Sequence, residues 1–574
     1  MASPSSMNTF RKASVAIALM GLLATNTGCS DFFKVNVDPL NPSTARLSDV
    51  LPVTQVAMGT YMGFSVNGLS QYTSALMQQL SSTRGIGSFQ QTGDSFSTQW
   101  SGLYADMLSN NQQIIKQGTD EQAWSYVGVA ELQKAFVVSQ MVDMWGDIPY
   151  SESLLGSNNR APKFDKASDV YEDVFRLIDS GIANLGKSST RTIGADDLIY
   201  NGDLAKWARF GRTLKLKLYN QIRLTRDVSS EVNVLISAPT TLMQPGDDFE
   251  LKYGASTQPD NRNLGYIGDY VNSGRENTIG KYFFDLMTNN RDPRIKYYFY
   301  NQATGPVSIA DYQPSGSNFV TVRFGSTGTN ASANNSSVRT LPGLYPVGGR
   351  YDAGGGGNAT SQYGKGVVAQ RLLTYFSRKF TEAELQLTVL NNPDKAKEAY
   401  VEAITASFRK LNAIAAAEGI PNTVPFQPAP VLVPQIPDVD NTSTQNPSIS
   451  KYINGNPAAP VGAVQRFDNV AANAKLKAIM TEKYVASFGF GMDAYTDFRR
   501  TGYPNLTVPQ SDKTGNPFDM ALPPGEVDDN DAQTVSQGSF PRRLTYQLSE
   551  LQLNPNAPGQ PNVVTDKIFW DKRN

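Results

Sequence analysis

Apolar residues recur every three or four positions through several long stretches of the chain, and this spacing predicts amphipathic helices. In one stretch the period runs through Val129, Leu132 and Phe136, until Gly146 and Pro149 end it. The same pattern covers residues 170–185, 207–222, 400–408 and 476–484. Successive helices with short breaks favour a mostly α fold, in which helix pairs stack as a tetratricopeptide-like superhelix without a sharp repeat of about 34 residues.

Two long segments interrupt this helical pattern. Residues 253–364 contain runs rich in Gly, Asn and Ser with tyrosines between them, and residues 421–465 begin with a proline-rich run. Loops of this length inside a folded protein are either functional or disordered. Disorder is the simpler interpretation of the glycine runs, whereas the interleaved tyrosines favour ordered loops.

The N-terminus carries the features of a secretory leader. Arg11 and Lys12 precede an apolar run, Ala13–Ala24, which is too short to span a bilayer. Small residues and then Cys29 follow, in a pattern that resembles a bacterial lipobox. We therefore expect a signal peptide over residues 1–28, acylation of Cys29, and an extended, proline-containing tether over residues 29–52. An ordinary signal peptide followed by a chance cysteine is the alternative.

Composition removes several classes of chemistry. The chain of 574 residues has no histidine and one cysteine, which excludes Ser-His-Asp triads, His-zinc sites and internal disulfides. Its 51 basic and 52 acidic residues nearly cancel, so we expect no nucleic-acid partner. We also expect no metal and no cofactor. Asp528, Asp529 and Asp531 could ligate Ca²⁺, but their spacing matches no calcium-loop motif.

Several motifs, in order along the chain, resemble those of the SusD/RagB family of outer-membrane nutrient-binding lipoproteins. The most specific is Trp145–Glu152, which reads WGDIPYSE. The others are Asn36–Pro42, Trp207–Leu218, the DPR turn Asp292–Arg294, Asp493–Pro504, Pro541–Asn554 and the terminal Phe569–Asp571. Tyr495 stands where the family usually has tryptophan.

This resemblance implies a fold and a function. Family members have a right-handed helical body of about four tetratricopeptide-like helix pairs with a loop-rich remainder, here residues 53–574 as a single domain. They are lipid-anchored at the surface of the outer membrane, where they cover a TonB-dependent SusC-like transporter. They bind oligosaccharides, or peptides in some members, and catalyse nothing. A glycoside hydrolase remains a remote alternative, since it requires only two carboxylates roughly 5–9 Å apart.

An oligosaccharide site needs an aromatic platform for the sugar face and polar groups for the hydroxyl rim. Two loop regions contain both kinds of side chain, Arg84 to Trp100 and Tyr266 to Tyr351. The predicted ligand-binding residues are Arg84, Phe89, Asp94, Phe96, Tyr266, Tyr270, Tyr345 and Tyr351. Trp100 is predicted to be a core residue instead.

The family motifs themselves are predicted to be structural. Gly146 and Pro149 end a helix, while Trp145 and Tyr150 bury apolar area. The arginine pairs Arg499-Arg500 and Arg542-Arg543 are expected to bind internal carboxylates. The basic residues of the 207–222 helix and its flanks, Arg209, Arg212, Lys215, Lys217, Arg223 and Arg226, are expected to face solvent.

Overall fold

The computed structural model describes residues 45–82, 89, 91–272, 275–290, 292–302, 319, 321, 324, 339–351, 364–420, 452–454, 462–506 and 540–573. The predicted signal peptide, Cys29, Arg84 and the three aspartates at 528, 529 and 531 lie outside these residues. Among the described residues, no helix combines the length and the apolar run that a membrane crossing requires.

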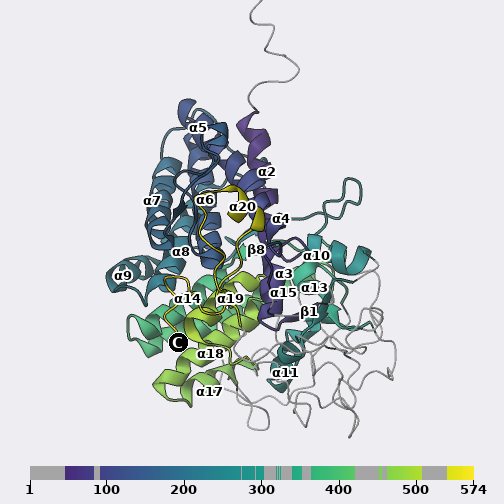
Figure 1. Ribbon diagram of the computed structural model, residues 1–574. Coiled ribbons are helices and arrows are strands. Elements are labelled where there is room, and N and C mark those ends of the chain that lie inside the picture. Colours follow the sequence, from purple (N-terminus) through teal and green to yellow (C-terminus); the bar gives the residue numbers. More distant parts are fainter. Residues whose placement is uncertain are drawn as a thin grey trace, which may run out of the picture.

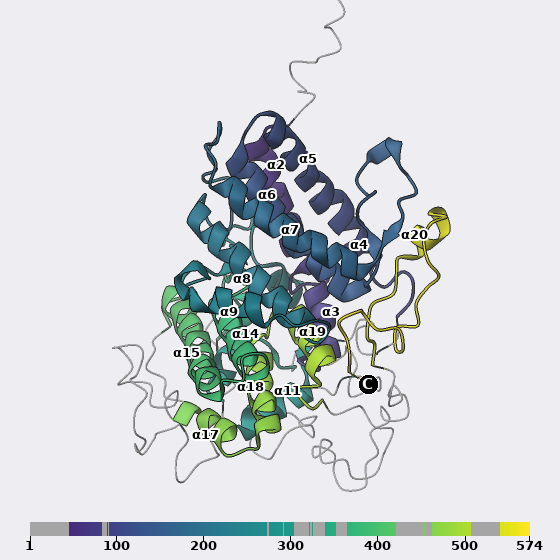
Figure 2. The same cartoon turned by 90° about the vertical axis from the view of Figure 1, so that its left-hand side faces the viewer.

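The fold is mostly helical, as predicted. Helices pack in neighbouring pairs, α6 against α7 and α14 against α15, and α2 packs against α5. Figures 1 and 2 show the α5–α7 layer at one end of the body, α8 and α9 in the middle, and α14, α15 and α18 at the other end. These helices are α2 (Leu47–Met62), α5 (Ser109–Asp120), α6 (Trp124–Trp145), α7 (Ala167–Leu185), α8 (Leu204–Ile222), α9 (Ser229–Ser237), α14 (Tyr375–Thr388), α15 (Pro393–Ala417) and α18 (Ala472–Ala486).

The predicted helices are confirmed, and local sequence explains their ends. Helix α6 stops where Gly146 adopts φ = 79°, a conformation that glycine enters without steric cost. At the start of α15, the Asn392 side chain accepts a hydrogen bond from the Lys395 amide, and Pro393 occupies the first helical position. The Asp203 carboxylate caps α8 in the same way through the Lys206 amide.

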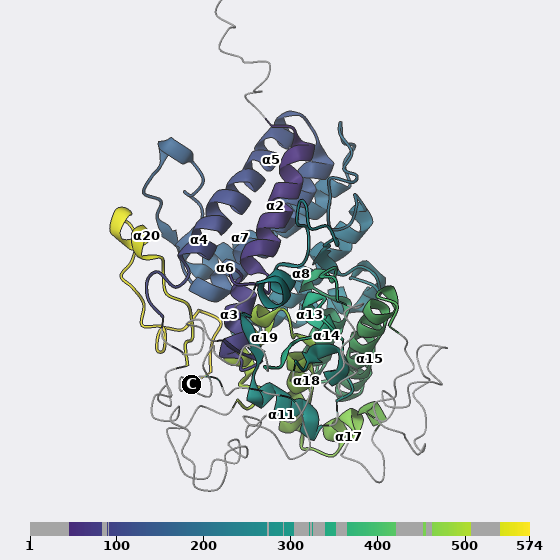
Figure 3. The same ribbon diagram turned by 90° about the vertical axis from the view of Figure 1, so that its right-hand side faces the viewer.

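Shorter elements and loops cover one side of the helical body. Figure 1 shows α3, α10, α11, α13 and β1 together there, and Figure 3 shows α3, α11 and α13 from that side. The short helices are α3 (Leu69–Leu76), α4 (Ser97–Gly102), η2 (Leu103–Leu108), η3 (Gly156–Asn158), η4 (Pro239–Thr241), α10 (Leu264–Tyr266), η5 (Ile267–Val271), α11 (Lys281–Asn289), α12 (Ile295–Tyr298), α13 (Leu344–Val347), α17 (Ala463–Asp468), α19 (Gly491–Thr501) and α20 (Leu548–Leu553).

In the described part of the chain, the strands form four two-stranded antiparallel sheets, and three of them connect segments that are distant in sequence. Strand β1 (Leu80–Ser82) pairs with β5 (Asn277–Ile279), and β4 (Phe249–Leu251) pairs with β8 (Gln370–Leu373). The other two sheets join β2 (Ile148–Pro149) to β3 (Phe164–Asp165) and β6 (Phe299–Tyr300) to β7 (Leu341–Pro342). Because β1 and β5 lie side by side, the two loop regions predicted to bind ligand are neighbours.

Helix α2 begins inside the segment predicted to be an extended tether. Its first residues, Leu47 to Pro52, are helical although Pro52 cannot donate a backbone hydrogen bond. Leu47 and Leu51 are fully buried, so apolar burial offsets that loss. Any extended segment therefore ends before Leu47.

Candidate functional site

The two predicted loop regions meet on the loop-rich side of the molecule. Just before the first region, Leu80 of β1 pairs with Ile279 of β5, and the Gln71 side chain donates a hydrogen bond of 2.7 Å to the Asn277 side chain. Within the first region, the Phe89 ring lies 5.0 Å from the ring of Phe324 in the second. Side chains from both regions can therefore contribute to one site.

Three tyrosines form a stack on this side, which we call the tyrosine stack: Tyr266, Tyr270 and Tyr300. The rings of Tyr266 and Tyr270 are nearly parallel, with centroids 5.1 Å apart and an interplanar angle of 14°. Both rings are half-buried, whereas Tyr300, 5.9 Å from Tyr270, is buried behind them. Residues four positions apart share one helical face, which explains how α10 and η5 align the first two rings.

Guanidinium groups border the tyrosine stack. Arg262 lies 5.6 Å from the centroid of the Tyr266 ring, and two hydrogen bonds to the Asp260 carboxylate hold it there. These hydrogen bonds from Arg262 lower the pKa of Asp260. Arg350 donates a longer hydrogen bond of 3.4 Å to the Tyr300 hydroxyl. A half-buried aromatic surface bordered by guanidinium donors suits the C–H face and the hydroxyl rim of a sugar ring.

The backbone beside the stack leaves no room for additional side chains. Gly366 has φ = 75°, and a Cβ atom there would lie 2.6 Å from the Tyr266 ring. A Cβ atom on Gly349 would similarly lie 2.5 Å from the Tyr270 ring. Glycine is therefore required at both positions for the rings to occupy their observed places.

Buried hydrogen bonds fix the turn that carries the stack. The Asn263 side chain accepts from the amides of Gly265 and Tyr266 and donates to the Val368 carbonyl. Asp269 is fully buried and accepts from the amide and the side chain of Asn277 on β5. Burial raises the pKa of Asp269 to about 7. The stack is thus anchored to strand β5 and to the backbone at Val368, just before β8.

Similarity to known proteins decides the family of this chain. Residues 43–523 match the SusD-like family described as "Starch-binding associating with outer membrane". The chain belongs to the SusD-like family. No curated protein matches the sequence significantly.

Solved structures support the SusD-like fold. A chitin-binding protein is 22% identical with a TM-score of 0.64, and the match covers 92% of this chain and 100% of that one. A SusD/RagB family protein from Bacteroides thetaiotaomicron is 19% identical with a TM-score of 0.61, covering 92% and 99%. A chitin-binding SusD homologue from Flavobacterium johnsoniae is 19% identical with a TM-score of 0.62, covering 92% and 97%.

The motifs that identified the SusD-like chain are structural, as predicted. Trp145 is fully buried and its indole donates to the Thr545 carbonyl at 3.0 Å. Trp100 packs edge-on against Trp145, which confirms it as a core residue. The arginine pairs bear out the expectation of internal carboxylate partners only in part. Arg500 contacts Glu384 and Asp497, and Arg542 contacts Asp571. Arg499 and Arg543 instead donate to the backbone carbonyls of Arg542 and Trp145.

The basic residues on and beside α8 are mostly paired with carboxylates, contrary to the expectation of a solvated row. The pairs are Arg209 with Asp247, Lys215 with Asp179, Lys217 with Asp493, Arg223 with Glu384, and Arg226 with Glu231. Carboxylates far along the chain supply most of these partners, so periodicity within the helix did not predict them.

Of the predicted ligand-binding residues, Tyr266 and Tyr270 are half-buried together in the stack and Asp94 is exposed. Phe89 and Phe96 are instead buried: Phe89 packs against Phe324 and Phe540, and Phe96 against Tyr72 and Trp145. Neighbouring rings therefore cover these two side chains, which are not exposed platforms in this structure.

Tyr345 and Tyr351 are also buried. The ring of Tyr345 is stacked on Tyr298 at 5.3 Å and has the Arg371 guanidinium carbon 3.4 Å from its centroid. Tyr351 is stacked on Tyr297 at 5.9 Å. Sequence reasoning missed Tyr300, Arg262 and Arg350, although each is an aromatic or guanidinium side chain within or next to the predicted tyrosine-bearing insertion.

Proposed function

We propose that this SusD-like protein captures oligosaccharides on its loop-rich side and delivers them, chemically unchanged, to a SusC-like TonB-dependent transporter. The observation that carries the proposal is the tyrosine stack with Arg262 beside it, in a family described as starch-binding and associated with the outer membrane. Two of the similar structures are named chitin-binding proteins, which makes chitin oligosaccharides suitable first ligands.

Binding at the stack requires no catalytic group. One sugar ring packs its C–H face on Tyr266 or Tyr270, while Arg262 and nearby backbone groups donate to its hydroxyls. A half-buried site with few anchors supports micromolar to millimolar affinity, which permits release to a transporter. A lipid anchor on Cys29 would hold the protein at the membrane.

Isothermal titration calorimetry of the chain that begins after Cys29 tests the proposal. The panel contains chitin, starch-type and other neutral oligosaccharides, together with short peptides. Tyr266→Ala and Tyr270→Ala should each weaken glycan binding about twofold to tenfold, since one aromatic contact contributes about 0.5–1.5 kcal/mol.

Tyr150→Ala is the matched control. Tyr150 is another half-buried tyrosine with a cation, Lys134, 5.5 Å from its ring, but it lies in the family motif beside α6. It should leave affinity unchanged. If no glycan of the panel binds but peptides do, the ligand is a peptide and not an oligosaccharide. If the purified chain cleaves any glycan, the proposal that it catalyses nothing is overturned.

A further inference from the structure

A separate cavity of about 280 Å³ opens between the β4–β8 strand pair and the C-terminal end of α15. Tyr253, Tyr345, Val368 and Ile414 supply aromatic and aliphatic walls. If each water occupies about 30 Å³, the cavity has room for about nine waters, which suits a single ring-sized molecule. Glycan capture at the tyrosine stack does not require this space.

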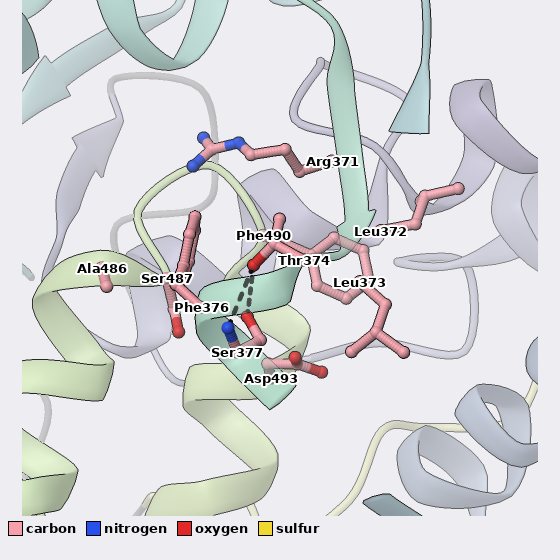
Figure 4. Close-up of a pocket in the computed structure, with 10 residues that line it drawn as sticks. All are labelled: Arg371, Leu372, Leu373, Thr374, Phe376, Ser377, Ala486, Ser487, Phe490 and Asp493. Atoms are coloured by element: carbon pink, nitrogen blue, oxygen red, sulfur yellow. Dashed lines mark hydrogen bonds between the residues drawn. The ribbon is translucent and has the colours of Figure 1, made fainter. Parts of the chain in front are cut away.

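One lining residue is a buried arginine without a carboxylate partner. Arg371 on β8 is 3% exposed. Figure 4, which draws a neighbouring pocket that Arg371 also lines, shows this side chain extending away from the hydrogen-bonded Thr374 and Ser377. One of its terminal nitrogens donates to the Phe488 carbonyl, but its Nε atom has no acceptor. Within the described part of the chain, no carboxylate forms an ion pair with it. Desolvation lowers the pKa of Arg371 to about 9, against the smaller raising effects of Tyr298, Glu250 and Asp248.

The nearest candidate carboxylates are engaged elsewhere. Glu250 is the cross-strand partner of Arg371, yet its carboxylate lies 2.5 Å from the Lys410 ammonium. Asp248 also binds Lys410, at 2.8 Å. The charged side chains in the lining are Lys252, Arg371, Lys410, Glu250 and Glu418. Lys410 is already paired with Glu250 and Asp248, which leaves Arg371 as the buried cation of the lining without a carboxylate among the described residues.

We propose that this cavity binds the carboxylate of a small ring-shaped acid, of which a hexuronate sugar is the expected form, with Arg371 as its anion partner. A bound carboxylate supplies the anionic acceptor that the buried guanidinium lacks. The aliphatic and aromatic walls contact the C–H groups of the ring.

Calorimetry with galacturonate, and with galactose as the neutral ring of the same size, tests the proposal on the chain that begins after Cys29. Galacturonate should bind at least about ten times more tightly, because only its carboxylate is an anionic acceptor for the Arg371 guanidinium, whereas galactose offers neutral hydroxyls. Digalacturonate is the second probe. If it binds as well as galacturonate, the source is the end of an acidic oligosaccharide; if only galacturonate binds, the source is the free sugar acid.

Two substitutions on α15 locate the binding site. Ala417 lines the cavity and is exposed, so Ala417→Phe should fill the opening and reduce galacturonate affinity more than about tenfold. Ala416 is exposed on the same turn but does not line the cavity, so Ala416→Phe should leave affinity within about twofold. Neither substitution should change the binding of neutral glycans at the tyrosine stack. A failure of the cavity proposal can therefore be distinguished from a failure of the proposed glycan capture at the stack.

Arg371→Gln should abolish the preference for galacturonate over galactose, with folding checked by circular dichroism. If that variant does not fold, the Ala417→Phe and Ala416→Phe pair decides the question. Equal binding of galacturonate and galactose by the unsubstituted chain, or unchanged galacturonate affinity in Ala417→Phe, would overturn the proposal.

Discussion

The helical body and the loop-rich side use the same kinds of side chain in opposite ways. In the body, Glu384 is fully buried between Arg500 and Arg223, and the ring of Trp145 is enclosed by Phe96 and Trp100. On the loop-rich side, Tyr266 and Tyr270 remain half-buried, and Arg371 has no carboxylate partner among the described residues.

This difference separates stability from binding. Guanidinium and aromatic groups whose hydrogen bonds and ring contacts are all made inside the protein cannot also bind a ligand. The groups that can still contact a ligand lie beside irregular backbone, where glycines such as Gly366 permit the chain to approach the rings closely. Substitutions in the body should therefore change unfolding, whereas substitutions at the stack should change binding.

The largest expected effect is on stability. Glu384→Gln leaves Arg500 and Arg223 buried without their charge partner, so the free energy of unfolding should fall by about 3–5 kcal/mol. Urea denaturation measures it. As a control, Asp179→Asn removes the exposed partner of Lys215 and should change stability by no more than about 1 kcal/mol. If Glu384→Gln and Asp179→Asn lowered the free energy of unfolding equally, the special role of buried ion pairs in the helical body would be contradicted.

Phe96→Ala tests whether Phe96 is a core residue, as the structure places it, or a ligand contact, as predicted from the sequence. Because this ring is 2% exposed and packs against Tyr72 and Trp145, its removal should cost about 3–5 kcal/mol of stability. Glycan affinity of the folded fraction should not change. A variant with full stability but weakened glycan binding would restore Phe96 as a ligand contact.

Gly366→Ala should change both the stability of the protein and its affinity for glycans. The substitution strains a backbone with φ = 75° and displaces the Tyr266 ring, so we expect a loss of about 1–3 kcal/mol in stability together with weaker glycan binding. Gly246 has φ = 87°, but no atom lies within 4 Å of the place a Cβ would take, so Gly246→Ala should cost stability alone. Thermal unfolding and calorimetry on both variants distinguish strain from ring displacement.

The last expected effect is a pH dependence of stability at the base of the stack. Burial raises the pKa of Asp269 to about 7, above the value of about 4 expected in the unfolded chain. The folded state therefore binds the proton more tightly, and the contribution of Asp269 to stability should be present below pH 4 and decline as pH rises to about 7.

Asp269→Asn should remove that decline. Urea midpoints measured between pH 4 and pH 8 provide the test, with the unsubstituted protein as reference. The same pH slope in both proteins would show that Asp269 does not titrate in this range.

Local sequence predicted the helical body well, because apolar periodicity and helix ends such as the one at Gly146 depend on neighbouring residues. It also placed Tyr266 and Tyr270 four positions apart in a candidate binding region. It could not show that Phe89 and Phe96 are covered, since Phe324, Phe540 and Trp145 come from distant parts of the chain. The cavity beside Arg371 was equally hidden, because it depends on the pairing of β4 with β8.

A crystal structure of the chain that begins after Cys29, with the tightest-binding neutral oligosaccharide from the panel, tests the central claim most directly. We expect an intact sugar ring packed on Tyr266 or Tyr270 and hydrogen-bonded to Arg262. A glycan bound against the helix pairs of the body instead, or found cleaved, would contradict the account.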